Sequence, residues 1–183
     1  RAPPVMPLRN PRRVSERDPD RSLALTMSIP QQENRAVEAL REFAPQAIED
    51  VQAFRGETTV FLRAEHLLRA CEFLRDAPGL AFKYLSDVTA VDRYPSEPRF
   101  EVVYHLLSLE NYQRLRLKVR VSGDDPRVAS VITVWPAANA FEREVFDLFG
   151  IRFEGHPYLR RILLPDDWEG HPLRKDYPTE GFR

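Results

Sequence analysis

Hydrophobic residues recur at helical spacing in two stretches of the chain. The first covers residues 33–44 and ends before Pro45, and the second covers residues 64–76 and is followed by Pro78-Gly79. Spacings of three and four place apolar side chains on one face of a helix. We therefore predict two amphipathic helices with one buried face each, formed by Ala36, Val37, Leu40, Phe43 and by Leu67, Leu68, Cys71, Leu74.

Alternating and β-branched positions predict strands between residues 48 and 121. The predicted strands are 48–54 (weakly alternating, as an edge strand is), 58–62, 82–91, 100–109 and 112–121. The last two form a hairpin joined through Glu110-Asn111. The expected fold is α/β, a mixed sheet covered by helices.

The strand at 112–121 has two chemically different faces. Leu115, Leu117, Val119 and Val121 point one way, and Arg114, Arg116, Lys118 and Arg120 point the other way. The cationic face is either a docking ribbon or a solvated sheet surface. Like charges along a strand repel, so we expect acidic neighbours such as Glu101, or a partner chain, beside them.

A further helix is predicted after Pro136, at residues 137–149. Its buried stripe would be Phe141, Val145, Leu148 and Phe149, with Arg143 and Asp147 as an i,i+4 ion pair and Gly150 as the stop. Residues 128–135, before it, read as a short helix or a buried strand. We expect Glu142 or Glu144 to pair with an arginine, either Arg160 or Arg161 or one from a partner.

The two ends of the chain differ from its middle. Residues 1–30 are rich in proline and arginine without apolar periodicity, so we expect a loosely ordered tail, and Met27 is an alternative start. Residues 31–150 form the predicted α/β domain. Residues 151–183 contain Gly-His-Pro twice and fit neither a helical nor a strand period. We expect an extended interaction arm, mobile in the isolated chain and buried on another protein.

Composition narrows the possible function classes. The net charge of −1 gives no general attraction to nucleic acid or anionic lipid. Cys71 is the only cysteine, so this chain cannot hold a cysteine-ligated iron–sulfur cluster. No stretch approaches the about 20 apolar residues of a membrane span. Neither a glycine-rich phosphate loop nor a nucleophile elbow occurs.

The acids and histidines of the arm offer one candidate for catalysis. His156 and His171, with nearby acids, could form a metal or acid–base cluster, which would make the protein a stand-alone metal-dependent hydrolase. The histidines lie fifteen residues apart on proline-flanked segments, and nothing in the spacing brings them together. The acids concerned are Glu154, Asp166, Asp167, Glu169 and Asp176.

Residues 142–178 resemble the signature of the C subunit of respiratory complex I, the proton-pumping NADH:quinone oxidoreductase. The pattern is carried by Glu142-Arg143-Glu144, Asp147, Leu148-Phe149, His156, Arg160 and Ile162-Leu163, and "DDWEGHPLRKDYP" at 166–178 continues it. The resemblance extends more loosely back to about residue 83. Tyr158 departs from it, since an acidic residue is common there. The chain ends soon after this motif, which favours the separate form over the form fused to the D subunit.

This resemblance implies a non-catalytic peripheral-arm subunit that stabilises the quinone-reducing module. It would pack mainly against the D subunit, with the B and I subunits nearby, in a hetero-oligomer at the cytoplasmic face of the bacterial inner membrane. NADH, FMN, iron–sulfur clusters and quinone would be bound by partner subunits, and none by this chain. The equivalent subunit of a related membrane-bound hydrogenase or quinone-type dehydrogenase is the alternative. The expected interface residues are Glu142, Glu144, Asp147, His156, Arg160, Arg161, Trp168, His171, Arg174, Lys175 and Tyr177.

Overall fold

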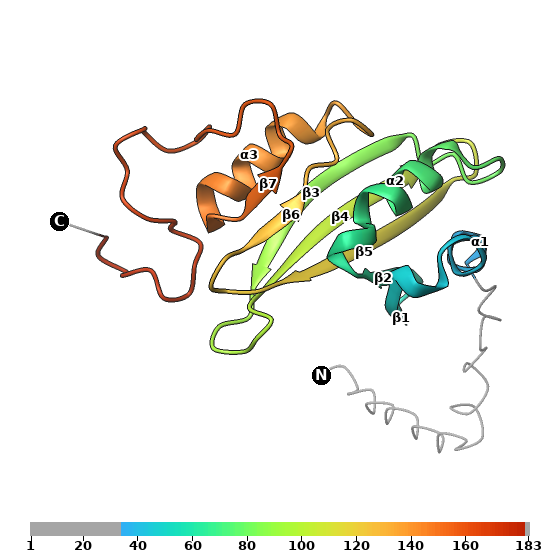
Figure 1. Ribbon diagram of the computed structural model, residues 1–183, viewed down its shortest axis with the longest axis horizontal. Coiled ribbons are helices and arrows are strands. Elements are labelled where there is room, and N and C mark those ends of the chain that lie inside the picture. Colours follow the sequence, from blue (N-terminus) through green and yellow to red (C-terminus); the bar gives the residue numbers. More distant parts are fainter. Residues whose placement is uncertain (1–33, 182–183) are drawn as a thin grey trace, which may run out of the picture. The chain divides into compact units, whose positions relative to one another are not determined.

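A five-stranded mixed sheet is the framework of the protein, shown in the computed structural model (Figure 1), which describes residues 34–181. The strands are β1 (Ile48–Phe54), β2 (Glu57–Leu62), β3 (Tyr84–Asp92), β4 (Phe100–Ser108) and β5 (Gln113–Val121). Their order is β1-β2-β5-β4-β3, with β2 parallel to β5 and the other neighbours antiparallel. The predicted mixed sheet, with β1 at its edge, is confirmed. The predicted tail at 1–30 lies outside the described residues.

Two helices follow the predicted amphipathic segments. These are α1 (Arg35–Phe43) and α2 (Leu67–Asp76), each next to a 3-10 turn, Pro45–Ala47 and Ala64–His66 respectively. The side chain of Asn34 caps α1 by accepting a hydrogen bond from the Ala36 amide. The apolar faces of both helices join the core, which includes the fully buried side chains of Leu40, Leu67, Leu74, Phe82, Phe100, Tyr104 and Leu117.

The opposite face of the sheet carries the cations of β5. Lys118 and Arg120 lie over the ring of Phe61, which is 3% exposed. Lys118 pairs with Glu101 at 2.9 Å, so the expected acidic neighbour is present. Neutralising contacts of this kind explain how a cationic row is tolerated on one strand.

A third helix, α3 (Ala138–Phe149), packs beside β3 and positions the candidate site (Figure 1). Gly150 ends it in the left-handed conformation, at φ 72°. The buried face of α3 contains Glu142 and Asp147 as well as apolar residues. The burial of these two acids was not predicted, because the buried stripe was inferred from hydrophobic side chains alone.

A small second sheet pairs the segment before α3 with the segment after it. Strand β6 (Arg127–Ala129) pairs in parallel with β7 (Arg152–Glu154). Residues 128–135 are thus a short strand followed by a turn. Strand β7 was not predicted. Since Ile151 and Phe153 are buried, the expected domain boundary after Gly150 falls inside the packed structure, and the described residues 34–181 belong to one compact unit.

Candidate functional site

The C-terminal segment, residues 155–181, contains no helix or strand, in agreement with its lack of period. It runs as a wide loop beside α3 (Figure 1). The segment is nevertheless bonded to its own domain at several points along its length. The structure therefore differs from the expectation of an arm that finds binding partners only on another protein.

Asp147 on α3 is the first anchor of this segment. Its Oδ2 accepts hydrogen bonds from the amides of Ile162, Leu163 and Leu164, at 3.0, 2.8 and 2.9 Å, and its Oδ1 lies 2.7 Å from Arg161 Nη1. Burial alone raises the pKa of Asp147, but these hydrogen bonds outweigh burial and hold the pKa below its usual value. The carboxylate therefore stays charged and fixes residues 161–164 on α3.

The expected pairing of acids on α3 with arginines occurs at a different acid. Glu142 is 0% exposed and accepts from Ser130 Oγ and from the Val131 amide, without an arginine partner. Glu144 is exposed and has no ion pair within residues 34–181. Arg143 does not pair with Asp147 and donates instead to the carbonyls of Arg160 and Arg161. Within residues 34–181 neither Glu142 nor Glu144 meets an arginine, because Arg161 pairs with the buried Asp147. Pairing with an arginine of a partner chain stays a prediction.

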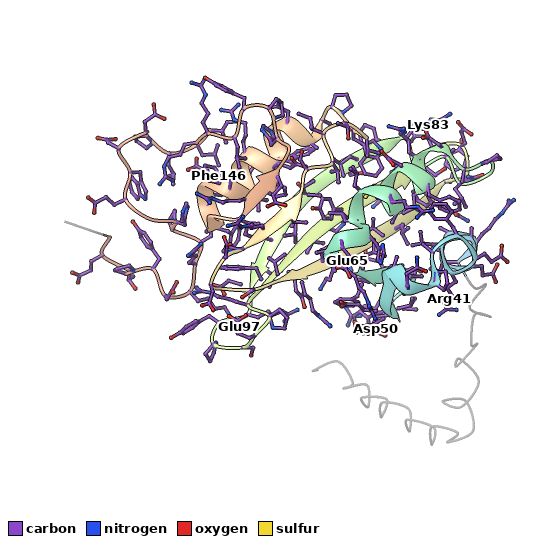
Figure 2. The ribbon with its side chains drawn as sticks, in the orientation of Figure 1. Arg41, Asp50, Glu65, Lys83, Glu97 and Phe146 are labelled. Carbon is purple, nitrogen blue, oxygen red and sulfur yellow. The ribbon has the colours of Figure 1, made fainter. Side chains whose placement is uncertain are left out.

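The two histidines are held by backbone carbonyls. His171 Nδ1 lies 2.8 Å from the Asp147 carbonyl oxygen, and His156 Nε2 lies 3.2 Å from the Asn139 carbonyl oxygen. Phe146, labelled in Figure 2, lies on the side of α3 that faces this segment and contacts the His171 ring edge-on. Within residues 34–181, no three His, Cys, Asp or Glu side chains are grouped as metal ligands would be.

Gly150 leaves room for the His171 ring because it has no side chain. A Cβ at this position would meet His171 Cδ2 and Nε2 at 2.5 Å and Arg174 Nη2 at 2.6 Å. Arg174 also donates to the carbonyl of Phe149 at 2.6 Å. Gly150 thus serves both the end of α3 and the close approach of the C-terminal segment.

A second anchor holds the far end of the segment. Arg99 binds Asp92 and Asp176 together, with Nη2 at 2.8 Å from Asp92 Oδ2 and 2.6 Å from Asp176 Oδ1. Asp92 also accepts from the Lys175 amide. Burial raises the pKa of Asp92, but the bonds from Arg99, Lys175 and Tyr94 outweigh it and lower the pKa to about 2. Sequence reasoning missed Arg99 and Asp92, since nothing in the pattern links a strand-end pair to residues 175–176.

Apolar side chains of the anchored segment remain exposed. Tyr158, Ile162, Leu163, Trp168 and Leu173 are 54, 40, 60, 41 and 51% exposed. The ring of Tyr158 lies 4.2 Å from the guanidinium of Arg160 and 5.9 Å from that of Arg143. The Tyr177 hydroxyl donates to the Glu169 carbonyl. We call the exposed side chains of Ile162, Leu163, Trp168 and Leu173 the apolar rim; Tyr158, which is held by two guanidinium groups, is not counted with them.

Residues 60–183 match the family model of the respiratory-chain NADH dehydrogenase 30 kDa subunit. The C subunit of the NADH-quinone oxidoreductase of Roseiflexus sp. (strain RS-1) is 52% identical over 142 residues, covering 78% of this chain and 82% of the relative. The C subunit of the same enzyme of Geobacter metallireducens is 51% identical over 149 residues, 81% of this chain and 91% of the relative.

Two solved structures are similar in fold and sequence. A trypsin-resistant fragment (1–134) of Nqo5 has a TM-score of 0.56 and 35% identity, covering 68% of this chain and 99% of the fragment. A chain of the membrane-bound sulfane sulfur reductase, an archaeal respiratory membrane complex, has a TM-score of 0.65 and 29% identity, covering 78% of this chain and 84% of that chain. Within residues 34–181, no helix has the length and apolar character needed to cross a membrane.

Proposed function

Because the chain belongs to the family of the respiratory-chain NADH dehydrogenase 30 kDa subunit, which is the C subunit of NADH-quinone oxidoreductase, we propose that it is a non-catalytic docking subunit of the peripheral arm. In this role it stabilises the quinone-reducing module. Electron transfer from NADH to quinone takes place on other subunits, which bind FMN, the iron–sulfur clusters and quinone.

The engaged side chains of the candidate site support a structural role. A general base or metal ligand needs a nitrogen that is free to meet a substrate or ion. His156 engages both ring nitrogens, Nε2 with the Asn139 carbonyl and Nδ1 with the Tyr158 amide. His171 directs Nδ1 to the Asp147 carbonyl, and its Nε2 packs against Gly150, where an added Cβ would lie 2.5 Å away. Cys71 is buried, and burial raises the pKa of its thiol far above the usual value, which opposes a role as nucleophile.

The observation that carries the proposal is the combination of a fixed backbone and exposed apolar side chains. Asp147 and Arg99 hold the C-terminal segment, while the side chains of the apolar rim remain 40 to 60% exposed. Large apolar side chains that stay exposed together on one segment favour an interaction site. A segment that is already ordered loses less conformational entropy on binding than a free arm does. We therefore propose a preorganised docking loop in place of an arm that folds on contact.

We propose the D subunit as the main partner of this loop, with the B and I subunits nearby, in a hetero-oligomer at the cytoplasmic face of the bacterial membrane. Trp168, flanked by Leu163 and Leu173, is the central anchor, because aromatic side chains carry most of the energy at such interfaces. Arg160 and Lys175 supply charge at the edge. Glu142, which is fully buried, does not reach the partner.

The test replaces the apolar rim while leaving the anchors in place. A triple variant, Leu163→Ser, Trp168→Ser and Leu173→Ser, is expected to leave the protein folded by circular dichroism and to reduce the amount of assembled oxidoreductase on native gels. The matched control, Phe54→Ser with Leu109→Ser, changes side chains that are 70 and 63% exposed elsewhere on the domain. Normal assembly of the triple variant would show that the loop is not the docking surface.

The second candidate function is that of the equivalent subunit in a related respiratory membrane complex. The likeness to a chain of the sulfane sulfur reductase complex favours it. Purification of the native complex distinguishes the two candidates. Recovery of flavin-containing and NADH-oxidising subunits together with this chain supports the NADH:quinone oxidoreductase, and their absence from an otherwise intact complex supports the related one.

A further inference from the structure

Two buried carboxylates lie five residues apart on α3 in opposite electrostatic surroundings. Glu142 and Asp147 are both 0% exposed. Asp147 has Arg161 at 2.7 Å and three backbone amides. Glu142 has a hydroxyl and one amide, from Ser130 at 2.6 Å and Val131 at 2.7 Å, and no cation. A buried charge without a counter-ion is far less favourable than a paired one.

The other groups that face Glu142 are neutral and come from two further elements. Cys71 on α2 and Tyr104 on β4 are both fully buried, and a charge on Glu142 raises the pKa of each. The Tyr104 hydroxyl is the one buried side-chain polar atom within residues 34–181 that has no hydrogen-bond partner. Neither group supplies positive charge. A proton on Glu142 is therefore the available means of removing the uncompensated charge at this point.

We propose that Glu142 is a pH-sensitive link between α3 and the segment after β6, neutral when its proton is bound and strained when the proton is released. Ser130 and Val131 belong to that segment, which continues from β6 into the turn before α3. When the proton is lost, the charged form favours opening of this contact, because opening lets water reach the carboxylate. The docking loop is bonded to the same helix through Asp147, so loosening of α3 reaches the loop directly.

The direction of the pH effect follows from the two environments. Burial raises the pKa of Glu142 to about 7, although the bonds from Ser130 and Val131 lower it. An acid whose pKa is higher in the folded state than in the unfolded state binds more protons when folded, so stability falls as pH rises between the two values. For Asp147 the shift is downward and the sign is opposite. Of these two acids, only Glu142 changes its charge near neutral pH.

The proposal is tested on the purified full chain. Infrared spectra over pH 5–8 should show the carbonyl band of a buried protonated carboxylic acid, which disappears as the pH passes through about 7 and is absent from Glu142→Gln. In Glu144→Gln, a change at an exposed acid of the same helix, the band should be unchanged. Titration of Glu142 in the range of an exposed glutamate would overturn the proposal.

Folding equilibria provide a second and independent measurement. For the parent, the folding equilibrium constant should fall roughly 70-fold more between pH 5 and pH 8 than it does in Glu142→Gln. Protection of the Val131 amide, corrected for intrinsic exchange, should decline over the same range and stay constant in the variant. If Glu142→Gln fails to fold, Ser130→Ala is the second variant. It removes a hydrogen-bond donor to the carboxylate of Glu142, so the pH at which stability falls should move upward. An unshifted transition in Ser130→Ala would contradict the link.

Discussion

Arg161 Nη1 lies 2.7 Å from Asp147 Oδ1, and this pair joins α3 to the docking loop with side chains that are 16 and 0% exposed. The same guanidinium donates through Nη2 to the carbonyls of Trp168 and Gly170. One arginine therefore connects the helix to both halves of the loop. The docking loop is thus ordered by a few side-chain contacts to its backbone groups, and not by the regular hydrogen bonds of a helix or sheet.

Asp147→Asn should release the first half of the loop. The variant loses the charge that Arg161 requires and directs an amide group at backbone donors, and breaking a buried pair costs roughly 3–5 kcal/mol. We expect faster trypsin cleavage after Arg160 and Arg161 in the variant, whereas Glu144→Gln should be cut at the parental rate. Because the pKa of Asp147 is lowered in the folded state, its contribution is complete at neutral pH and is lost on acidification through that folded pKa. Equal cleavage of all three proteins would argue against the anchor.

Arg99→Ala should release the second half of the loop. Removal of the guanidinium leaves Asp92, which is 4% exposed, charged and without its cation, so we expect a loss of roughly 3 kcal/mol or more in the free energy of unfolding. Trypsin cleavage after Arg174 and Lys175 should accelerate. Arg114→Ala is the matched control, since this arginine is exposed and has no ion pair within the described residues. Denaturant titration of both variants gives the comparison, and a similar loss in each would refute the role of Arg99.

Local pattern was sufficient to predict most of the sheet and all three helices. The alternation of Leu115, Leu117 and Val119 with cations is visible in the sequence, and the structure places these apolar side chains in the core. Strand β7 was missed because three residues are too few to show a period. The burial of acids on α3 was not predicted for a related reason. In the sequence, a buried acid such as Glu142 cannot be told from a solvated one, because its partners Ser130 and Val131 are not evident there.

The anchors of the docking loop lay beyond prediction for a different physical reason. Asp92 and Asp176 meet on Arg99 across 84 positions of sequence, through a loop and a chain reversal that no local pattern specifies. The prediction of a mobile arm followed from counting apolar side chains and their lack of period. The contacts that hold the segment are made largely by backbone amides. Every residue except proline carries one, so they leave no mark in the pattern of apolar side chains.

The histidines should affect assembly more than turnover. His171→Ala removes the bond to the Asp147 carbonyl and the ring that fills the space over Gly150, and His156→Ala removes the bond to the Asn139 carbonyl. We expect less assembled complex in both variants, with the greater loss for His171→Ala. NADH:quinone activity per unit of bound flavin should stay near the parental value. A normal amount of complex with collapsed turnover would favour a catalytic role.

Tyr158 should tolerate replacement by an acid better than replacement by an aliphatic side chain. Its ring accepts the guanidinium of Arg160 at 4.2 Å and that of Arg143 at 5.9 Å, as a carboxylate in this position would. Cation–π contacts at exposed sites contribute about 0.5–1 kcal/mol. We expect Tyr158→Glu to give as much assembled complex as the parent protein and Tyr158→Leu to give less. The amount of complex is measured on native gels with both variants expressed at a low level. The reverse order would show that the ring is used for apolar contact with the partner.

Amide hydrogen exchange of the isolated full chain separates a preorganised loop from a mobile arm. A mobile arm predicts fast exchange across all of residues 155–178. The hydrogen bonds predict a mixed pattern in which amides bonded to the domain are protected, namely Ile162, Leu163 and Leu164 on Asp147, Leu173 on the Leu148 carbonyl and Lys175 on Asp92.

The amides of Arg160 and Glu169 provide the internal reference for this measurement, because neither has a hydrogen bond within residues 34–181. They should exchange quickly, since exchange requires an amide to be open to water. Asp147→Asn should remove protection at Ile162, Leu163 and Leu164 and leave Lys175 protected, because Arg99 and Asp92 hold that end independently. Uniformly fast exchange in the parent would restore the mobile arm and would move the ordering of the loop to the moment of assembly.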